Sequence, residues 1–216
     1  MQITKINKTK AHTVYKLANG TRVPGVTTIT GMLNKPALIK WANNLGLQGV
    51  DSTKYVDTLA DIGTLAHNLV ECDLIGAKPD ISEYSSKEID LAENSLLSYF
   101  EWKKDKEIEV YMIEKQLISE LYQYGGQIDA YLKINGVKTL LDLKTSKAIY
   151  SEMVTQVAAY RNLLRENGHD VVDICILRIG REKNEGFEYH KCGNLDLHFQ
   201  KFIHCLAIYN IDKKLK

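Results

Sequence analysis

The chain has 216 residues, of which 44% are hydrophobic and 25% are charged, and its formal net charge at pH 7 is +1. This composition is too polar for a membrane protein and too apolar for a disordered chain, so it indicates a soluble globular protein. The charge is unevenly distributed. Residues 1–50 hold seven Lys or Arg and no Asp or Glu, whereas residues 51–120 hold 16 acidic and 7 basic residues. The basic segment is compatible with a polyanion-binding arm and equally with a solvated face.

Targeting signals and metal-binding cysteines are not recognisable. The first 30 residues lack the apolar run of a signal peptide, and no stretch approaches the ~20 apolar residues of a membrane span. We therefore expect a cytoplasmic protein without a membrane partner. Cys72, Cys175, Cys192 and Cys205 form no CxxC pair, so we expect neither a zinc knuckle nor an iron–sulfur cluster, and buried free thiols instead.

The first predicted elements are a hairpin and a short helix. Residues 12–29 carry Asn19-Gly20 between two β-prone runs, which is a hairpin signal, and Pro24 interrupts the second run. A short helix follows from Pro36 to Leu45.

Two longer helices follow. Residues 56–75 have apolar side chains at helical spacing and are followed by Gly76, while Gly63 within them suggests close packing. Ser85 and Glu88 have the spacing of a capping box and predict the start of the next helix.

The second half of the chain alternates strands and helices. The predicted elements are strands Ile108–Ile118, Gln127–Ile134 and Val137–Lys144, a helix over 150–167, strands Val171–Ile179 and Phe187–Lys191, and a helix from Leu195 to Ile211. This order predicts an α/β sandwich around a mixed sheet.

One predicted hairpin brings two carboxylates together. In GGQIDAYLKINGVKTLLDLKTSK, residues 125–147, Asn135-Gly136 indicates a two-residue type I′ turn. Such a turn places Asp129 opposite Asp142 on the neighbouring strand.

Alternation along the two strands predicts which side chains share a face. We expect the core face to hold Ile128, Ala130, Leu132, Ile134, Val137, Thr139, Leu141 and Leu143. Asp129, Asp142 and Lys144 lie on the other face. Two carboxylates ~5 Å apart repel by roughly 3 kcal/mol at a dielectric of ~20. Solvent screening of a surface pair bridged by Lys144, protonation of one carboxyl, or a bound divalent cation would each offset this repulsion.

The spacing Asp142-x-Lys144 favours the cation. Both side chains lie on one face of one strand, so a metal held by Asp129 and Asp142 would have an ammonium beside its bound water. Mg²⁺ suits such a site because it binds few carboxylates and keeps several waters. This arrangement is suited to phosphodiester hydrolysis.

Several short motifs together resemble a known enzyme superfamily. They are His67 in GTLAHNLVE, Glu114 in MIEKQL, Asp129 in GGQIDA, Asp142 and Lys144 in LLDLKTS, and Gln156 with Tyr160 in QVAAY. In this order the motifs resemble the PD-(D/E)XK nuclease superfamily, in particular its RecB-like exonuclease branch, which includes phage-encoded exonucleases and the mitochondrial genome maintenance exonuclease. The segment TRVPGVTTITGMLNKPALIKWANNLG also resembles the N-terminal part of phage-type members.

The resemblance implies a restriction-endonuclease-like core, in which a mixed central β-sheet is flanked by helices and preceded by an N-terminal hairpin and helical extension. We expect a single nuclease domain over 1–216. Its expected parts are a basic hairpin and helix extension at 1–50, a helical part at 56–106, an αβ nuclease core at 107–192 and a C-terminal helix at 193–216.

The resemblance also implies a metal site. Asp129, Asp142, the backbone carbonyl of Leu143 and His67 would bind the ion, Lys144 would position the attacking water, and Glu114 would support a metal-bound water or a second ion. The alternatives from the residues themselves are a structural histidine on an amphipathic helix and an edge-strand acid paired with a surface base.

Nucleic-acid contacts are implied on the same basis. Gln156 and Tyr160, four residues apart on one helical face, would contact the nucleic acid, although Tyr160 could instead cap the core. Thr145 and Ser146 would donate to a phosphate or cap the following helix. Independently of the resemblance, the acid-free basic segment offers Lys35 and Lys40 to guide a strand, with Tyr15 and Trp41 as candidate stacking aromatics, although Trp41 could equally belong to the core.

The expected function is an Mg²⁺- or Mn²⁺-dependent DNA exonuclease that acts on free single- or double-stranded ends in replication, recombination or repair, in a bacterial or phage-infected cell. An endonuclease of the same superfamily, a non-catalytic nucleic-acid-binding module and a globular protein with ordinary surface acids stay open as alternatives. Because the chain has no Walker A motif, a helicase, recombinase or single-strand-binding partner would be a separate chain.

Overall fold

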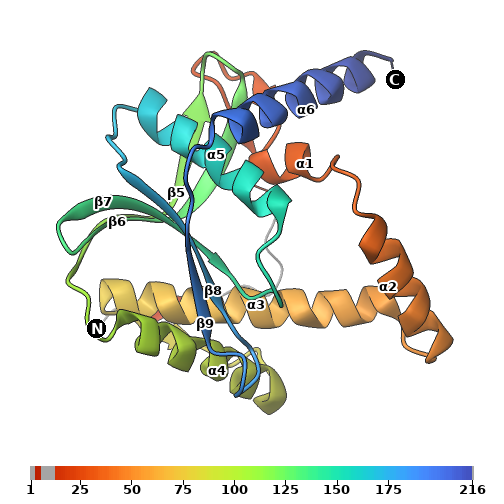
Figure 1. Cartoon of the computed structure of the whole chain (residues 1–216), viewed down its shortest axis with the longest axis vertical. Helices are drawn as coiled ribbons and strands as arrows, with labels where there is room; N and C mark the ends of the chain where they lie inside the picture. The colour runs from red at the N-terminus through yellow and green to blue at the C-terminus, as the bar shows by residue number, and fades with distance from the viewer. Residues whose placement is uncertain (1–2, 6–12, 216) are drawn as a thin grey trace.

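A central sheet between two layers of helices forms the body of the protein in the computed structural model, which describes residues 3–5 and 13–215 (Figure 1). The helices are α1 (Val26–Thr30), α2 (Pro36–Leu47), α3 (Ser52–Ile75), α4 (Ser86–Lys103), α5 (Ser151–Glu166) and α6 (Asp196–Leu215). The sheet consists of β5 (Ile108–Ser119), β6 (Tyr124–Ile134), β7 (Val137–Lys144), β8 (Asp173–Ile179) and β9 (Phe187–Lys191). Helices α1, α5 and α6 cover one face, and α3 and α4 cover the other (Figure 1).

The five-stranded sheet has the order β5-β6-β7-β8-β9 and is mixed, as predicted, because β7 and β8 are parallel and the other neighbours are antiparallel. The predicted turn between β6 and β7 is confirmed. Ile134 pairs with Val137, and the turn residues Asn135 and Gly136 have φ of 48° and 85°. These positive values are those that a type I′ turn requires.

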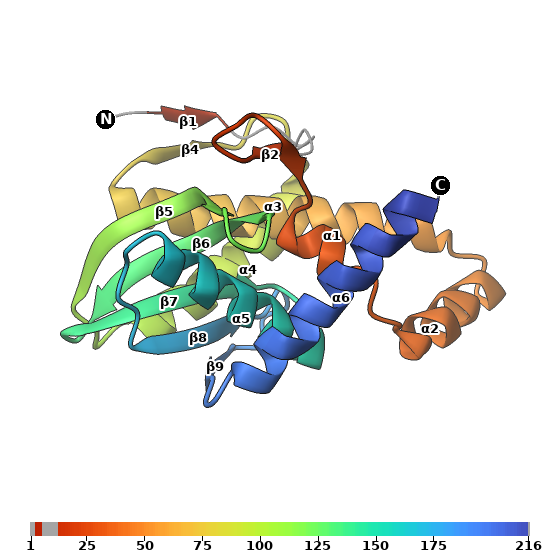
Figure 2. The same ribbon diagram turned by 90° about the horizontal axis from the view of Figure 1, so that it is seen from above.

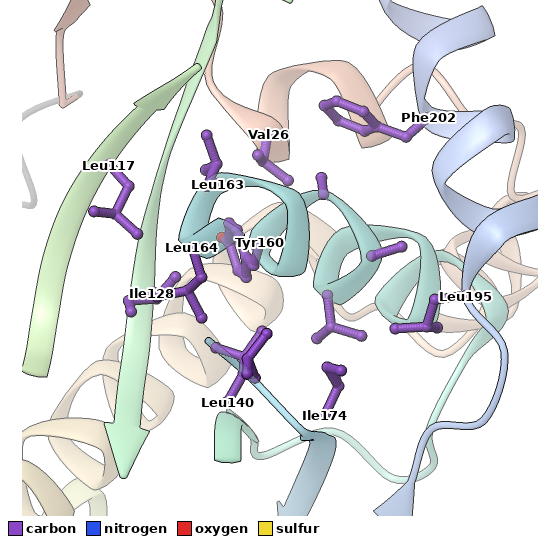
Figure 3. Close-up of a cluster of buried hydrophobic side chains, with 14 of the residues drawn as sticks. Val26, Leu117, Ile128, Leu140, Tyr160, Leu163, Leu164, Ile174, Leu195 and Phe202 are labelled. Atoms are coloured by element: carbon purple, nitrogen blue, oxygen red, sulfur yellow. The ribbon is translucent and has the colours of Figure 1, made fainter. Parts of the chain in front are cut away.

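Both faces of the sheet are buried, so the expectation of a single apolar face is wrong. Tyr131 and Leu140 lie on the side of the acids and pack against α5, whereas Ala130 and Leu141 pack against α4. Ile128 also belongs to the α5 side, where it lies near Leu140 and Leu164 (Figure 3). Alternation cannot separate core from solvent in this sheet because helices cover both surfaces.

The N-terminal hairpin is shorter than predicted. Strands β2 (Tyr15–Lys16) and β3 (Arg22–Val23) pair antiparallel, but the β-branched run after Pro24 forms helix α1 instead of continuing the second strand. The helix buries Val26 and Ile29, which are three residues apart, in the cluster under α5 and α6 (Figure 3). This tertiary burial overrides the β propensity of the run.

Local signals account for the helical half. Helix α3 begins earlier than predicted because the Asp51 side chain accepts hydrogen bonds from the backbone N–H groups of Thr53 and Lys54. It ends at Gly76, which has φ of 67°, as expected for a left-handed C-cap. The predicted capping box of Ser85 and Glu88 is present at the start of α4.

A short strand pair and one helix lie outside the central sheet. Strands β1 (Ile3–Lys5) and β4 (Lys78–Asp80) form an unpredicted parallel pair, and α2 stands away from the sheet without a buried residue (Figure 2).

The four cysteines are buried free thiols, as expected. Across the described residues, no helix combines the length and apolarity needed to cross a bilayer. Lys8 and Lys10 of the basic segment lie outside the described residues.

Candidate active site

The site lies where β6 and β7 separate. Their backbone pairing ends at Ala130 and Leu141, and beyond this point the N–H of Leu143 donates to Oδ2 of Asp129 at 2.7 Å. The start of β6 pairs instead with the N-terminal segment, since Gly125 forms a parallel bridge with Gly25. A cavity of about 230 Å³ opens at this fork.

Residues from seven elements line the cavity. They are Tyr15 of β2, Val26 and Thr27 of α1, His67 of α3, Glu114 of β5, Gly126, Gln127 and Asp129 of β6, Lys144 of β7, and Gln156 and Tyr160 of α5. Six residues named in the sequence motifs are therefore brought to one place: His67, Glu114, Asp129, Lys144, Gln156 and Tyr160.

Three of these side chains form a group that fits a metal ion. One ligand atom each from His67, Glu114 and Asp129 lies within 4.8 Å of the others, and all three side chains are half-buried. The Nδ1 atom of His67 is 3.8 Å from Oδ1 of Asp129. Two carboxylates and one imidazole nitrogen suit Mg²⁺ or Mn²⁺ better than a thiolate-preferring metal.

The backbone of Glu114 is strained. Its φ of 47° lies in the left-handed region, within strand β5, although the residue is not a glycine. Such a conformation costs about 1–3 kcal/mol and is found where the surrounding structure enforces it, often at functional sites. The side-chain amide of Gln127 donates to the Glu114 carboxylate and holds it in the cavity.

Gln127 was not predicted as a site residue. Its signal in the sequence is its position in GGQIDA, two residues before Asp129. Residues at this spacing share a face of a strand, so a polar side chain there is placed beside the acid.

Asp142 is not among the residues that line the cavity and is not part of the three-residue group. Its side chain is 1% exposed, and the ammonium of Lys144 forms an ion pair with Oδ2. Among the described residues, neither carboxylate oxygen accepts a well-oriented hydrogen bond. The alternative of a solvated surface pair is therefore wrong for this acid.

Burial sets the electrostatics of this pair. It raises the pKa of Asp142 to about 6, with Lys144 opposing the rise and Asp129 adding to it. Burial alone would lower the pKa of Lys144, but attraction to Asp142 and Asp129 outweighs it and raises that pKa. Lys144 is therefore a cation at neutral pH. Because Oδ1 of Asp142 has no hydrogen-bond partner among the described residues, this buried carboxylate is a further ligand that fits a cation beside the three-residue group.

Helix α5 supplies two neutral donors. The Nε2 group of Gln156 donates to the hydroxyl oxygen of Tyr160 at 2.9 Å, which leaves the phenol proton for another acceptor. The Tyr160 side chain packs in the core, as one of its predicted roles requires, and also lines the cavity. Burial raises the pKa of Tyr160 well above its usual value, so the phenol stays protonated.

Thr145 and Ser146 do not line the cavity. Thr145 lies against α3, where a methyl group on Gly63 would be 3.0 Å from its hydroxyl, and this confirms the close packing predicted for Gly63. The Ser146 hydroxyl donates to the carbonyl of Ala148 at 2.7 Å. Helix α5 begins only at Ser151, so the prediction that Thr145 or Ser146 caps it is wrong.

Lys35 and Lys40 of the N-terminal segment are not among the residues that line the cavity. Lys35 forms an ion pair of 3.1 Å with Glu152 of α5, and Lys40 is exposed on α2. Trp41 is half-buried and packs beside Tyr55, with ring centroids 5.9 Å apart. Lys35 therefore contacts α5, and Trp41 contacts α3.

Comparisons with known proteins find a structural likeness but no match to a protein family or a curated protein. No protein-family model matches the sequence. No curated protein matches it either. Among solved structures, the chain is similar to a candidate exonuclease from Eubacterium rectale, with a TM-score of 0.47 and 16% sequence identity. The match covers 71% of this chain and 66% of that protein.

Proposed function

We propose that this protein is a divalent-metal-dependent nuclease that hydrolyses phosphodiester bonds from free DNA ends. One observation carries the proposal: His67, Glu114, Asp129, Lys144, Gln156 and Tyr160 come from five elements and line one cavity. A metal-ligand group, a cation and neutral donors in one cavity match the needs of phosphodiester hydrolysis.

The proposed fold family follows from the same residues. The mixed sheet places Asp129 on β6 and the Asp142-x-Lys144 sequence on β7, as in the PD-(D/E)XK superfamily that the motifs resemble. We infer that the chain forms a single nuclease domain with a restriction-endonuclease-like core, and that it resembles the RecB-like exonuclease branch.

Metal binding is assigned to four side chains. His67, Glu114 and Asp129 would hold Mg²⁺ or Mn²⁺, with Asp142 and the Leu143 carbonyl as further ligands from β7. When bound, the ion would polarise the phosphate and make a water more acidic.

Lys144 acts as a fixed positive charge in this proposal. Because its pKa is raised, the ammonium donates hydrogen bonds and does not remove a proton. It would orient the attacking water and stabilise the charge that develops on the phosphate oxygens. The ion pair with Asp142 holds the ammonium in place. Gln156 and Tyr160 would hold the strand through its phosphate oxygens.

Digestion of labelled DNA tests the function. The purified protein with Mg²⁺ or Mn²⁺ should degrade end-labelled linear single- or double-stranded DNA, spare covalently closed circles, and stop when EDTA is added. Asp129→Asn should abolish degradation. Asp170→Asn is the matched control because the Asp170 side chain is 94% exposed and lies away from the cavity lining.

Each alternative has its own result in this assay. Cleavage of the closed circle would indicate an endonuclease instead of an exonuclease. Binding of DNA without cleavage by any of the added metals would indicate a non-catalytic module. If the protein neither binds nor cleaves DNA, it is an ordinary globular protein with surface acids. Equal activity in Asp129→Asn and the wild type would refute the proposed site.

A further inference from the structure

Two adjacent glycines in β6 make room for two tyrosine rings. A methyl group on Gly125 would lie 2.5 Å from Cδ1 of Tyr15, and one on Gly126 would lie 2.7 Å from Cε1 of Tyr160. Neighbouring residues of a strand point to opposite faces, so the two rings approach β6 from opposite sides. Both tyrosines line the cavity. The Gly125-Gly126 pair therefore admits a second tyrosine to the site, opposite the one on α5.

The packing of Tyr15 determines which group it can offer. Its ring also lies against Gly25, where a methyl group would be 2.9 Å from Cε2, and Gly25 is bridged to Gly125. Glycine backbone from two distant parts of the chain therefore covers the ring. A covered ring is poorly placed to stack on a base, which leaves the hydroxyl as its recognition group.

The Tyr15 hydroxyl shares the cavity lining with the metal-ligand group. A phenol is neutral at physiological pH and can donate one hydrogen bond. A ligand that enters this cavity and presents oxygens both to a metal held by that group and to this donor is a phosphate.

We propose that Tyr15 is a substrate-contacting residue whose hydroxyl donates to a phosphate oxygen of the bound DNA strand, across the cavity from Tyr160. This inference rests on the proposed function. It makes the β2–β3 hairpin part of the active site, although 52 residues separate Tyr15 from His67, the next motif residue along the chain.

The conservative variant Tyr15→Phe tests the hydroxyl alone, because the ring can keep its place over Gly25 and Gly125. The probes are a labelled single-stranded oligonucleotide, whose dissociation constant is measured with Ca²⁺, and its hydrolysis with Mg²⁺. Loss of a hydrogen bond to a charged oxygen should weaken binding about 10-fold and raise KM similarly, with a smaller change in kcat. The midpoint of thermal unfolding should not change.

Two further variants sharpen the test. Tyr111→Phe is the matched control, because Tyr111 is 39% exposed on the outer strand β5 and does not line the cavity. It should leave binding unchanged. Gly125→Ala should weaken binding at least as much as Tyr15→Phe by displacing the ring. The double variant Tyr15→Phe/Gly125→Ala should bind little more weakly than either single variant, because both substitutions remove the same hydroxyl from the site.

Failure of this inference is distinct from failure of the proposed function. If the wild type cleaves DNA and Tyr15→Phe has unchanged binding and KM, only the inference is wrong. If Tyr15→Phe changes the thermal midpoint alone, Tyr15 is structural and the inference is also wrong. If the wild type binds but does not cleave, the nuclease proposal is wrong, and the binding comparison still decides the role of Tyr15. If the wild type neither binds nor cleaves, both are refuted.

Discussion

The carboxylate of Asp129 accepts a hydrogen bond from the backbone N–H of Leu143, 2.7 Å away on the neighbouring strand. This contact lies just beyond the last backbone pair of β6 and β7, so it takes the place of the ladder where the strands separate. The other oxygen, Oδ1, faces His67. The Asp129 side chain therefore links β6 to β7 where their backbone pairing ends, and it also offers a ligand atom to the cavity.

Substitutions of Asp129 should separate these two tasks. Asp129→Asn keeps an acceptor for Leu143 but loses the charge, so it should abolish stabilisation by Mg²⁺ while changing the metal-free stability by less than about 1 kcal/mol. Asp129→Ala leaves the N–H of Leu143 without its acceptor and should cost about 1–3 kcal/mol more. Urea denaturation with and without Mg²⁺ measures both effects. Equal metal-free stability of the two variants would contradict the structural part of this prediction.

The ion pair of Lys144 with Asp142 should be needed for stability as well as activity. Lys144→Met leaves a buried carboxylate unpaired and should reduce the free energy of unfolding at pH 8 by about 3–5 kcal/mol. The double variant Asp142→Asn/Lys144→Met should recover much of this loss but no activity. Lys138→Met, at a side chain that is 46% exposed, is the control. Equal losses for Lys144→Met and Lys138→Met would contradict the buried pairing.

The β6–β7 hairpin was predictable from the sequence because local rules place it. The Asn135-Gly136 turn determines the register of the two strands as far as Ala130 and Leu141, where the backbone pairing ends. Alternation put Asp142 and Lys144 on one face, although it did not reveal that this face is buried. Helical spacing placed Gln156 and Tyr160 on one face, but only the resemblance to a nuclease superfamily singled them out as site residues, together with His67 and Glu114.

The rest depends on packing between distant segments. The left-handed conformation of Glu114 and its hydrogen bond with Gln127 arise from two strands held together by the whole sheet. The position of Tyr15 depends on a bridge between Gly25 and Gly125. Local propensity contains no information about such contacts, and in the run that follows Pro24 it favoured the wrong element.

Gly126 should not tolerate a side chain. In Gly126→Ala the new methyl group would lie 2.7 Å from Cε1 of Tyr160 and 3.0 Å from side-chain atoms of Leu163 and Val26. Overpacking of this kind costs about 1–3 kcal/mol. Gly46→Ala is the matched control, because a methyl group on Gly46 in helix α2 would meet no atom within 4 Å beyond its own stretch of helix, and the substitution should gain about 0.4–1 kcal/mol. A thermal midpoint for Gly126→Ala at or above that of the wild type would contradict the packing at β6.

Buried tyrosines should make the protein unstable at alkaline pH. Burial raises the pKa of Tyr124, whose hydroxyl donates to the carbonyl of Ala159. Above about pH 10 the unfolded chain releases this proton and the folded chain keeps it, so stability falls as pH rises, by about 1.4 kcal/mol per unit for each such tyrosine. Tyr124→Phe should lose about 1 kcal/mol at pH 7 and show a shallower fall between pH 10 and 11.5. Urea denaturation across this range measures the slope, and an unchanged slope would contradict the prediction.

The two lysines assigned to strand guiding should differ in their effect on DNA binding. Lys40 is exposed on α2, whereas the charge of Lys35 is balanced by Glu152 at 3.1 Å. Lys40→Gln should weaken binding and reduce the slope of log affinity against log salt by about 0.7–0.9, the release of roughly one counterion. Lys35→Gln should change the slope less, because its charge is already partly neutralised. Titration of a labelled oligonucleotide at salt concentrations from about 50 to 200 mM gives the slope for each variant. A larger slope change for Lys35→Gln than for Lys40→Gln would place the nucleic acid beside α5 instead of along α2.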